Sequence, residues 1–159
     1  MRACCLTQND RFGFVHPIVD AHALEISPLE QLLAARGFNT VTADATAREA
    51  FGDPENPANG QPIAQWIREN GITVLGFSYC LDPHDSAGKF ALLLALLRRL
   101  KLLASQGGPL RALFFAGLPE ACRMVRYRHR EVAGVFSGDE TPAEMLSILG
   151  ISADEAGRQ

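Results

Sequence analysis

The side chains best suited to chemistry lie in a polar and aromatic stretch near the start of the chain, between residues 8 and 26. Within this stretch, Asp20-Ala21-His22 places a carboxylate two positions before an imidazole. An acidic side chain can orient a metal-ligating histidine and raise the basicity of its ring nitrogen. A histidine in isolation is more often a surface or core residue, so the sequence leaves both interpretations of His22 open.

A second interpretation is a small enzyme that uses loop side chains, namely Asp10, His16, His22 and Cys80. A thiol close to a histidine can act as a nucleophile, because the base favours the thiolate. The motifs of dinucleotide-binding enzymes (GxGxxG), P-loop proteins (GxxxxGK[ST]) and α/β-hydrolases (GxSxG) do not occur in the chain. The sequence does not identify a base partner for Cys80, and we therefore name no catalytic residue.

These side chains must be positioned by elements that alternate along the chain between strand and helix. Ile72–Ser78 is nearly continuous in apolar residues, which is typical of a strand covered on both faces of a parallel sheet. Ser27 with Glu30, and Thr141 with Glu144, form the capping-box pattern of helix starts. The predicted strands cover residues 3–7, 41–43, 72–78, 110–115 and 132–136, and the predicted helices cover 28–37, 62–70, 86–105, 120–131 and 142–150.

Five strands, each followed by a helix, predict an α/β fold with a doubly wound, five-stranded parallel sheet of the Rossmann-like or flavodoxin-like type. The 159 residues suit one domain, for which we expect residues 1–151, followed by a polar tail at 152–159. Ligands of such sheets bind beyond the carboxyl ends of the strands. The loops of interest therefore begin at Thr7, Asp44, Ser78, Ala116 and Ser137.

Three of these loops carry residues that suit a ligand. Ser78 offers a hydroxyl group, although a serine there can also satisfy a backbone group of the turn. Gly117 would let the backbone approach a ligand closely, or it is simply part of a turn. The backbone amides of Ser137 and Gly138 could serve an anionic tail, whereas the neighbouring Asp139-Glu140 pair argues against a free phosphate.

Four stretches within residues 3 to 151 form an ordered set of motifs. Pro28–Phe38 is a leucine-rich helix pattern followed by glycine and a bulky residue, and Ile72–Ser78 ends in Gly-x-Ser. Ala116–Pro119 is similar to a Gly-Gly turn, and Ser137–Pro142 is similar to a Gly-Glu-x-Glu-Thr turn. In this order the motifs resemble the cobalamin-binding domain family, above all the N-terminal domain of cobalamin-dependent radical SAM enzymes.

The resemblance implies that cobalamin, or another corrinoid, lies over the carboxyl edge of the sheet, with Asn9–Phe14 against the lower face of the corrin. Asp20-Ala21-His22 matches the first half of the family's Asp-x-His-x-x-Gly motif, which makes His22 the candidate axial cobalt ligand, with Glu25 in place of glycine. Ser78-Tyr79-Cys80 stands where the family has Ser-x-Leu. The predicted cofactor-binding residues are Asn9, Asp10, Arg11, Phe12, Gly13, Phe14, Ser78, Tyr79, Gly117, Leu118, Ser137 and Gly138.

The chain contains no CxxxCxxC cluster motif, so radical chemistry would belong to a partner in this interpretation. We expect a corrinoid-binding domain or carrier subunit that serves a methyltransferase, mutase or radical SAM enzyme. The alternative is a cofactor-free accessory or protein-interaction module with the same fold. The segment 89–103 is apolar on nearly every side, which predicts an excess face that docks a partner or forms a homodimer.

Composition and charge argue against nucleic acid and membrane partners. A net charge of −3 gives no general attraction to nucleic acid or an anionic membrane, and the cluster Arg123–Arg130 is interpreted as a solvated helix face. Arg98, Arg99 and Lys101 interrupt the longest apolar run, which is too short for a membrane span. The chain start lacks the apolar core of a signal peptide, and four cysteines without CxxC spacing suggest reduced thiols, so we expect a cytoplasmic protein.

Overall fold

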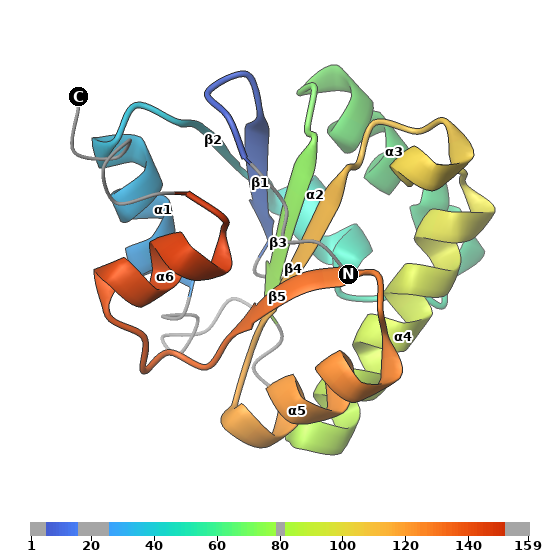
Figure 1. The fold of residues 1–159 in the computed structure, drawn as a ribbon. Coiled ribbons are helices and arrows are strands. Elements are labelled where there is room, and N and C mark those ends of the chain that lie inside the picture. The colour runs from blue at the N-terminus through green and yellow to red at the C-terminus, as the bar shows by residue number, and fades with distance from the viewer. Residues whose placement is uncertain (1–5, 16–25, 79–81, 152–159) are drawn as a thin grey trace.

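Five strands form one sheet in which all neighbouring strands are parallel (Figure 1). The computed structural model describes residues 6–15, 26–78 and 82–151. The strand order is β2-β1-β3-β4-β5, which is the flavodoxin-like order and confirms the predicted doubly wound α/β fold. The strands are β1 (Arg11–Val15), β2 (Asn39–Thr42), β3 (Val74–Ser78), β4 (Ala112–Ala116) and β5 (Val132–Phe136).

Helices cover both faces of this sheet. On one face α1 and α6 pack together, and on the other face α2, α3, α4 and α5 form a larger layer (Figure 1). The helices are α1 (Ile26–Ala35), α2 (Ala45–Phe51), α3 (Gly60–Glu69), α4 (Pro83–Arg99), α5 (Pro119–Arg128) and α6 (Pro142–Ile148), with short 3-10 turns η1 (Pro57–Asn59) and η2 (Ala104–Gln106).

The two faces of the sheet hold separate apolar cores because successive strand residues point to opposite sides. Along β4, Leu113 and Phe115 pack into the core under α2–α5. Phe114, between them, packs into the core under α1 and α6. Every residue of β4 is buried, as a parallel strand with helices on both sides must be.

The first strand differs from its prediction. Leu6 and Thr7 precede a turn, and β1 begins only at Arg11. Phe12 and Phe14 point into one core with their rings stacked at 6.2 Å between centroids. The apolar run at 3–7 suggested a strand there, but Arg11–Val15 has the alternating pattern that buries side chains on both faces. Residues 3–5 lie outside the part of the chain that the structure describes.

The prediction of an excess apolar face at 89–103 is also wrong. Of the apolar side chains that suggested it, Leu92 is the one that is largely exposed. The others are buried or half-buried, because α4 packs against the sheet on one side and against α5 on another. Past the end of α4, Leu102 and Leu103 turn inward, and Leu103 bridges to Leu110. No helix in the described ranges is long and apolar enough to cross a membrane.

Candidate functional site

The order of the strands places the topological switch point of the sheet, where a ligand crevice is expected, between the carboxyl ends of β1 and β3. The chain leaves β1 toward α1 on one face of the sheet, and leaves β3 toward α4 on the other. Neighbouring strands whose connections depart in opposite directions form the switch point at which flavodoxin-like folds bind ligands. The two strands end at Val15 and Ser78, so these two positions mark the candidate site.

Several predicted site residues fall in the two segments that follow these strand ends. Residues 16–25, which include Asp20 and His22, lie outside the described residues, as do Tyr79 and Cys80. Because β1 ends at Val15, Asp20 follows the strand by only five positions in the sequence. The Asp-x-His pair therefore comes directly after the candidate crevice in chain order, closer than a first strand at 3–7 implied.

Ser78 is the described residue that best marks a ligand site at this crevice. Its side chain is buried, with 2% of its surface exposed, and its hydroxyl oxygen has no hydrogen-bond partner among the described residues. A buried hydroxyl without a partner costs about 1–3 kcal/mol. Native proteins avoid this cost in most places, so such a group at a strand's carboxyl end makes the position a candidate ligand contact.

The turn after β4 is closely packed against other parts of the protein. The Gly117 amide donates to the Phe136 carbonyl at 3.0 Å, which joins the ends of β4 and β5. A Cβ atom on Gly117 would come within 2.9 Å of the Phe115 ring. The Cys122 thiol lies 3.2 Å from the Phe136 carbonyl oxygen. The glycine is therefore required by the close packing of this turn, while Leu118 beside it is exposed at the same edge.

The turn after β5 holds an anion that belongs to the chain itself. The Glu140 carboxylate accepts hydrogen bonds from the Ser137 amide at 2.9 Å, the Ser137 hydroxyl at 3.0 Å and the Gly138 amide at 3.0 Å. Burial works to raise the pKa of Glu140, but these hydrogen bonds outweigh it and lower the pKa below its ordinary value. The amides predicted to serve an anionic tail are thus satisfied by Glu140.

The carboxyl edge carries further acidic side chains at the starts of its helices. Asp44 caps α2 through the Ala47 amide, and Asp82 caps α4 through the Asp85 amide. Carboxylates suit these positions because the amino end of a helix is partly positive. Within the described ranges, no group of three histidine, cysteine or acidic residues could hold a metal ion.

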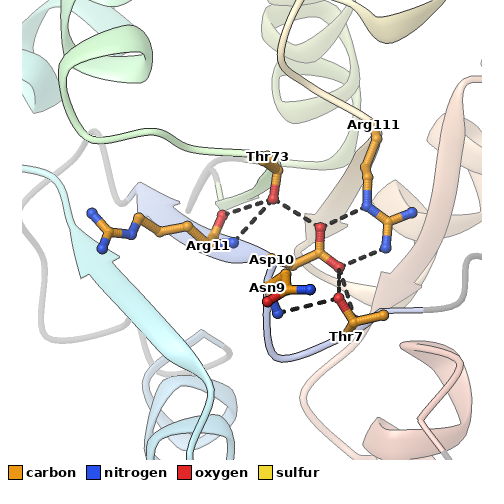
Figure 2. A network of polar contacts seen from close by, with 6 residues as sticks. All are labelled: Thr7, Asn9, Asp10, Arg11, Thr73 and Arg111. Carbon is orange, nitrogen blue, oxygen red and sulfur yellow. Dashed lines mark hydrogen bonds and ion pairs between the residues drawn. The ribbon is translucent and has the colours of Figure 1, made fainter.

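A second polar centre lies at the opposite, amino edge of the sheet (Figure 2). Asp10 precedes β1, Thr73 precedes β3 and Arg111 precedes β4. Arg111 donates to both Asp10 carboxylate oxygens, at 2.6 Å from Nε and 2.5 Å from Nη2. The Thr73 hydroxyl and the Thr7 amide donate to the same carboxylate at 2.9 and 2.8 Å. Burial works to raise the pKa of Asp10, but these four donors and the charge of Arg111 together lower it.

Six predicted cofactor-binding residues are therefore not where the sequence placed them. Asn9, Asp10 and Arg11 lie at the amino edge, away from the strand ends where ligands of such sheets bind (Figure 2). Phe12 and Phe14 are buried in the core. A Cβ atom on Gly13 would approach the Trp66 side chain to 2.8 Å, so that position is closely packed as well.

Sequence reasoning missed the Asp10–Arg111 pair completely. The stretch from Thr7 to Asp10 has the polar composition of a turn, and that local signal was available. Nothing in the sequence links Asp10 to a residue 101 positions later. No protein-family model matches the chain, and no curated protein or solved structure is significantly similar to it.

Proposed function

We propose that this domain binds a corrinoid, namely cobalamin or a relative, at the crevice between β1 and β3, and presents it to a partner enzyme. The observation that carries the proposal is the buried, unpartnered hydroxyl of Ser78 at the carboxyl end of β3. The motif order that resembles cobalamin-binding domains gives this hydroxyl a candidate ligand. A partner of the methyltransferase, mutase or radical SAM class would then carry out the reaction.

The described residues fit part of such a cofactor. The Ser78 hydroxyl can pair with a polar substituent that enters the crevice, which would remove the cost of its burial. Leu118 offers exposed apolar surface at the same edge. Ser137 and Gly138 do not fit an anionic group while Glu140 occupies their amides. When bound, the corrinoid supplies a cobalt centre, and the residues of this chain hold and orient it.

His22 keeps its role as the proposed axial ligand, with Asp20 as the residue that orients its imidazole. This part of the proposal rests on the resemblance, because both residues lie outside the described ranges. The spacing of five positions between Val15 and Asp20 supports it, since the pair directly follows the strand that borders the crevice.

The first experiment is to incubate the purified protein with hydroxocobalamin, desalt it and record the visible spectrum. We expect the desalted protein to retain the visible absorbance of one equivalent of cobalamin. A colourless protein would contradict the proposal. His22→Ala should change the spectrum of the retained cofactor. An unchanged spectrum would exclude His22 as the ligand and leave corrinoid binding itself intact.

Ser78→Ala gives a sharper test because stability and binding should move in opposite directions. Removing the unpartnered hydroxyl should leave stability unchanged or raise it by up to about 1 kcal/mol, whereas cobalamin affinity should fall by about tenfold. Ser147→Ala is the matched control, because Ser147 is exposed on α6, which packs against β5 and α1. Equal affinities of the two variants would exclude Ser78 from the site.

A cofactor-free interaction module is the second candidate function. It is favoured by Glu140, whose carboxylate fills the amide cradle after β5. In that case the protein stays colourless after incubation with cobalamin, and Glu140→Gln alters only the stability of the fold. A retained cofactor in the wild type excludes this candidate.

A further inference from the structure

Three arginines on the outward side of α5 and a fourth just after the helix lie close in the sequence to one exposed tyrosine. Ala121, Cys122 and Val125 are buried in the core and Met124 packs against it, whereas Arg123, Arg126 and Arg128 are exposed. Tyr127 is 90% exposed. We define the α5 arginine face as Arg123, Arg126, Tyr127, Arg128 and Arg130.

Among the described residues, the arginines of this face have no charge partner. The described ion pairs join Lys89 to Glu55, Arg98 to Glu131 and Arg111 to Asp10, and none of them involves the α5 arginine face. Residues 119–130 contain four arginines and one glutamate, although the net charge of the whole chain is −3. The positive charge is therefore local and uncompensated.

Keeping these charges together has a cost for the free domain. Arg123 and Arg126 are three positions apart on one helix, so their like charges repel. The helix dipole favours cations in the last turn, which accounts for Arg126 and Arg128 but not for Arg123. The neighbouring His129 also experiences this positive charge. Its pKa is lowered by burial and by the charges of Arg98 and Arg128.

We propose that the α5 arginine face docks an acidic surface of a protein partner. Arginine and tyrosine are the residue types most enriched at the centres of protein interfaces, and arginine pairs with carboxylates through two parallel hydrogen bonds. The helical part of the face, from Arg123 to Arg128, is about 9 Å long. This length suits the small contact of a transient complex.

Nucleic acid is a poorer fit to the same face. Single strands are bound by grooves in which several aromatic side chains stack on successive bases, and this face has one aromatic residue on a convex helix. Glu120 lies at the start of the same helix, where it would repel a phosphate backbone that continued along it. The net charge of −3 opposes long-range attraction to a polyanion.

The α5 helix lies beside α4 in the larger helical layer, and its core-facing side is already used (Figure 1). This docking face does not depend on the corrinoid proposal, since it rests on charges that a colourless protein would also carry.

The test measures binding of two labelled probes by fluorescence anisotropy at low and high salt: a poly-L-glutamate peptide and a single-stranded oligonucleotide of equal length. We expect the peptide to bind more tightly at low salt and to be released at high salt. Arg123→Gln should weaken peptide binding about fivefold and Tyr127→Ala about tenfold. Arg68→Gln is the matched control, because Arg68 is also an exposed helical arginine with no ion pair among the described residues.

Three results would overturn the proposal. The first is no peptide binding at low salt. The second is an equal loss of affinity in Arg68→Gln and Arg123→Gln, which would mean that only net charge matters. The third is tighter binding of the oligonucleotide with the same sensitivity to Tyr127→Ala, which would assign the face to nucleic acid. Because these substitutions are on the surface, the melting temperatures of the variants should stay close to that of the wild type.

Discussion

Asp10 and Arg111 form a two-point ion pair although 101 positions separate them in the chain. The Asp10 side chain is 4% exposed and the Arg111 side chain is 38% exposed, so the carboxylate is buried while part of the guanidinium meets solvent. With Thr73, the pair links the segments that enter β1, β3 and β4 (Figure 2). Every polar atom of the carboxylate is satisfied, which is the state expected of a structural group.

The first prediction concerns the removal of this charge. Asp10→Asn should lower the free energy of unfolding by about 2–3 kcal/mol, because the buried acceptor loses its charge-assisted bonds to Arg111. The estimate stays below that for a fully buried pair because solvent can rehydrate the guanidinium. Urea denaturation measures the change. Asp139→Asn is the control, since Asp139 is exposed, and a similar loss in both variants would contradict the assignment.

The second prediction follows from the lowered pKa of Asp10. A carboxyl group whose pKa is lower in the folded protein than the ordinary 3.8 stabilises the fold fully above that value. This stability is lost as the pH falls through the folded pKa, because the unfolded chain binds the proton more readily. Urea midpoints measured between about pH 5 and pH 2 should fall more steeply for the wild type than for Asp10→Asn. Parallel curves would contradict the prediction.

The third prediction concerns His129 at the end of α5. Its ring packs against Phe90, and its buried Nε2 atom has no hydrogen-bond partner in the described part of the chain. Burial and the nearby arginines lower its pKa from 6.5, so the folded state favours the neutral imidazole. As the pH falls below 6.5, the unfolded chain takes up a proton first, and stability declines until the folded pKa is reached.

His129→Gln should remove this part of the pH dependence and leave stability flatter between about pH 7 and pH 5. Chemical denaturation across this range is the measurement, and the exposed His84 provides the control through His84→Gln. A slope that persists in His129→Gln would assign the effect to another group.

The fourth prediction compares two glycines. A Cβ atom on Gly76 in β3 would lie 2.9 Å from the Phe14 ring, whereas a Cβ atom on Gly88 in α4 would meet nothing within 4 Å. Gly76→Ala should therefore destabilise the fold by about 1–3 kcal/mol through overpacking. Gly88→Ala should stabilise it by about 0.5–1 kcal/mol, because alanine favours the helix. Thermal or urea unfolding of both variants measures these changes. An unchanged stability of Gly76→Ala would refute the packing argument.

Local patterns explain which elements were predictable. The run Ile72–Ser78 contains β3, and the run Leu110–Phe115 covers β4 except its last residue, because continuous apolar runs between helical segments have few other structures available. The capping box from Thr141 to Glu144 is present at the start of α6. At β1 the prediction was wrong, since the short apolar run at 3–7 competed with the alternating Arg11–Val15 and both have the composition of a strand.

The sequence by itself determined most of the alternation of strands and helices, the capping box of α6 and the parallel class of the sheet, because these depend on residues a few positions apart. It did not predict α2, and Ser27, predicted as a helix cap, lies inside α1. Only the tertiary structure decided that Asp10 meets Arg111 at the amino edge, that Ser78 is buried without a partner, and that α4 has no spare apolar face. Each of these depends on which strands become neighbours. Packing between distant segments sets that order, and no local pattern records it.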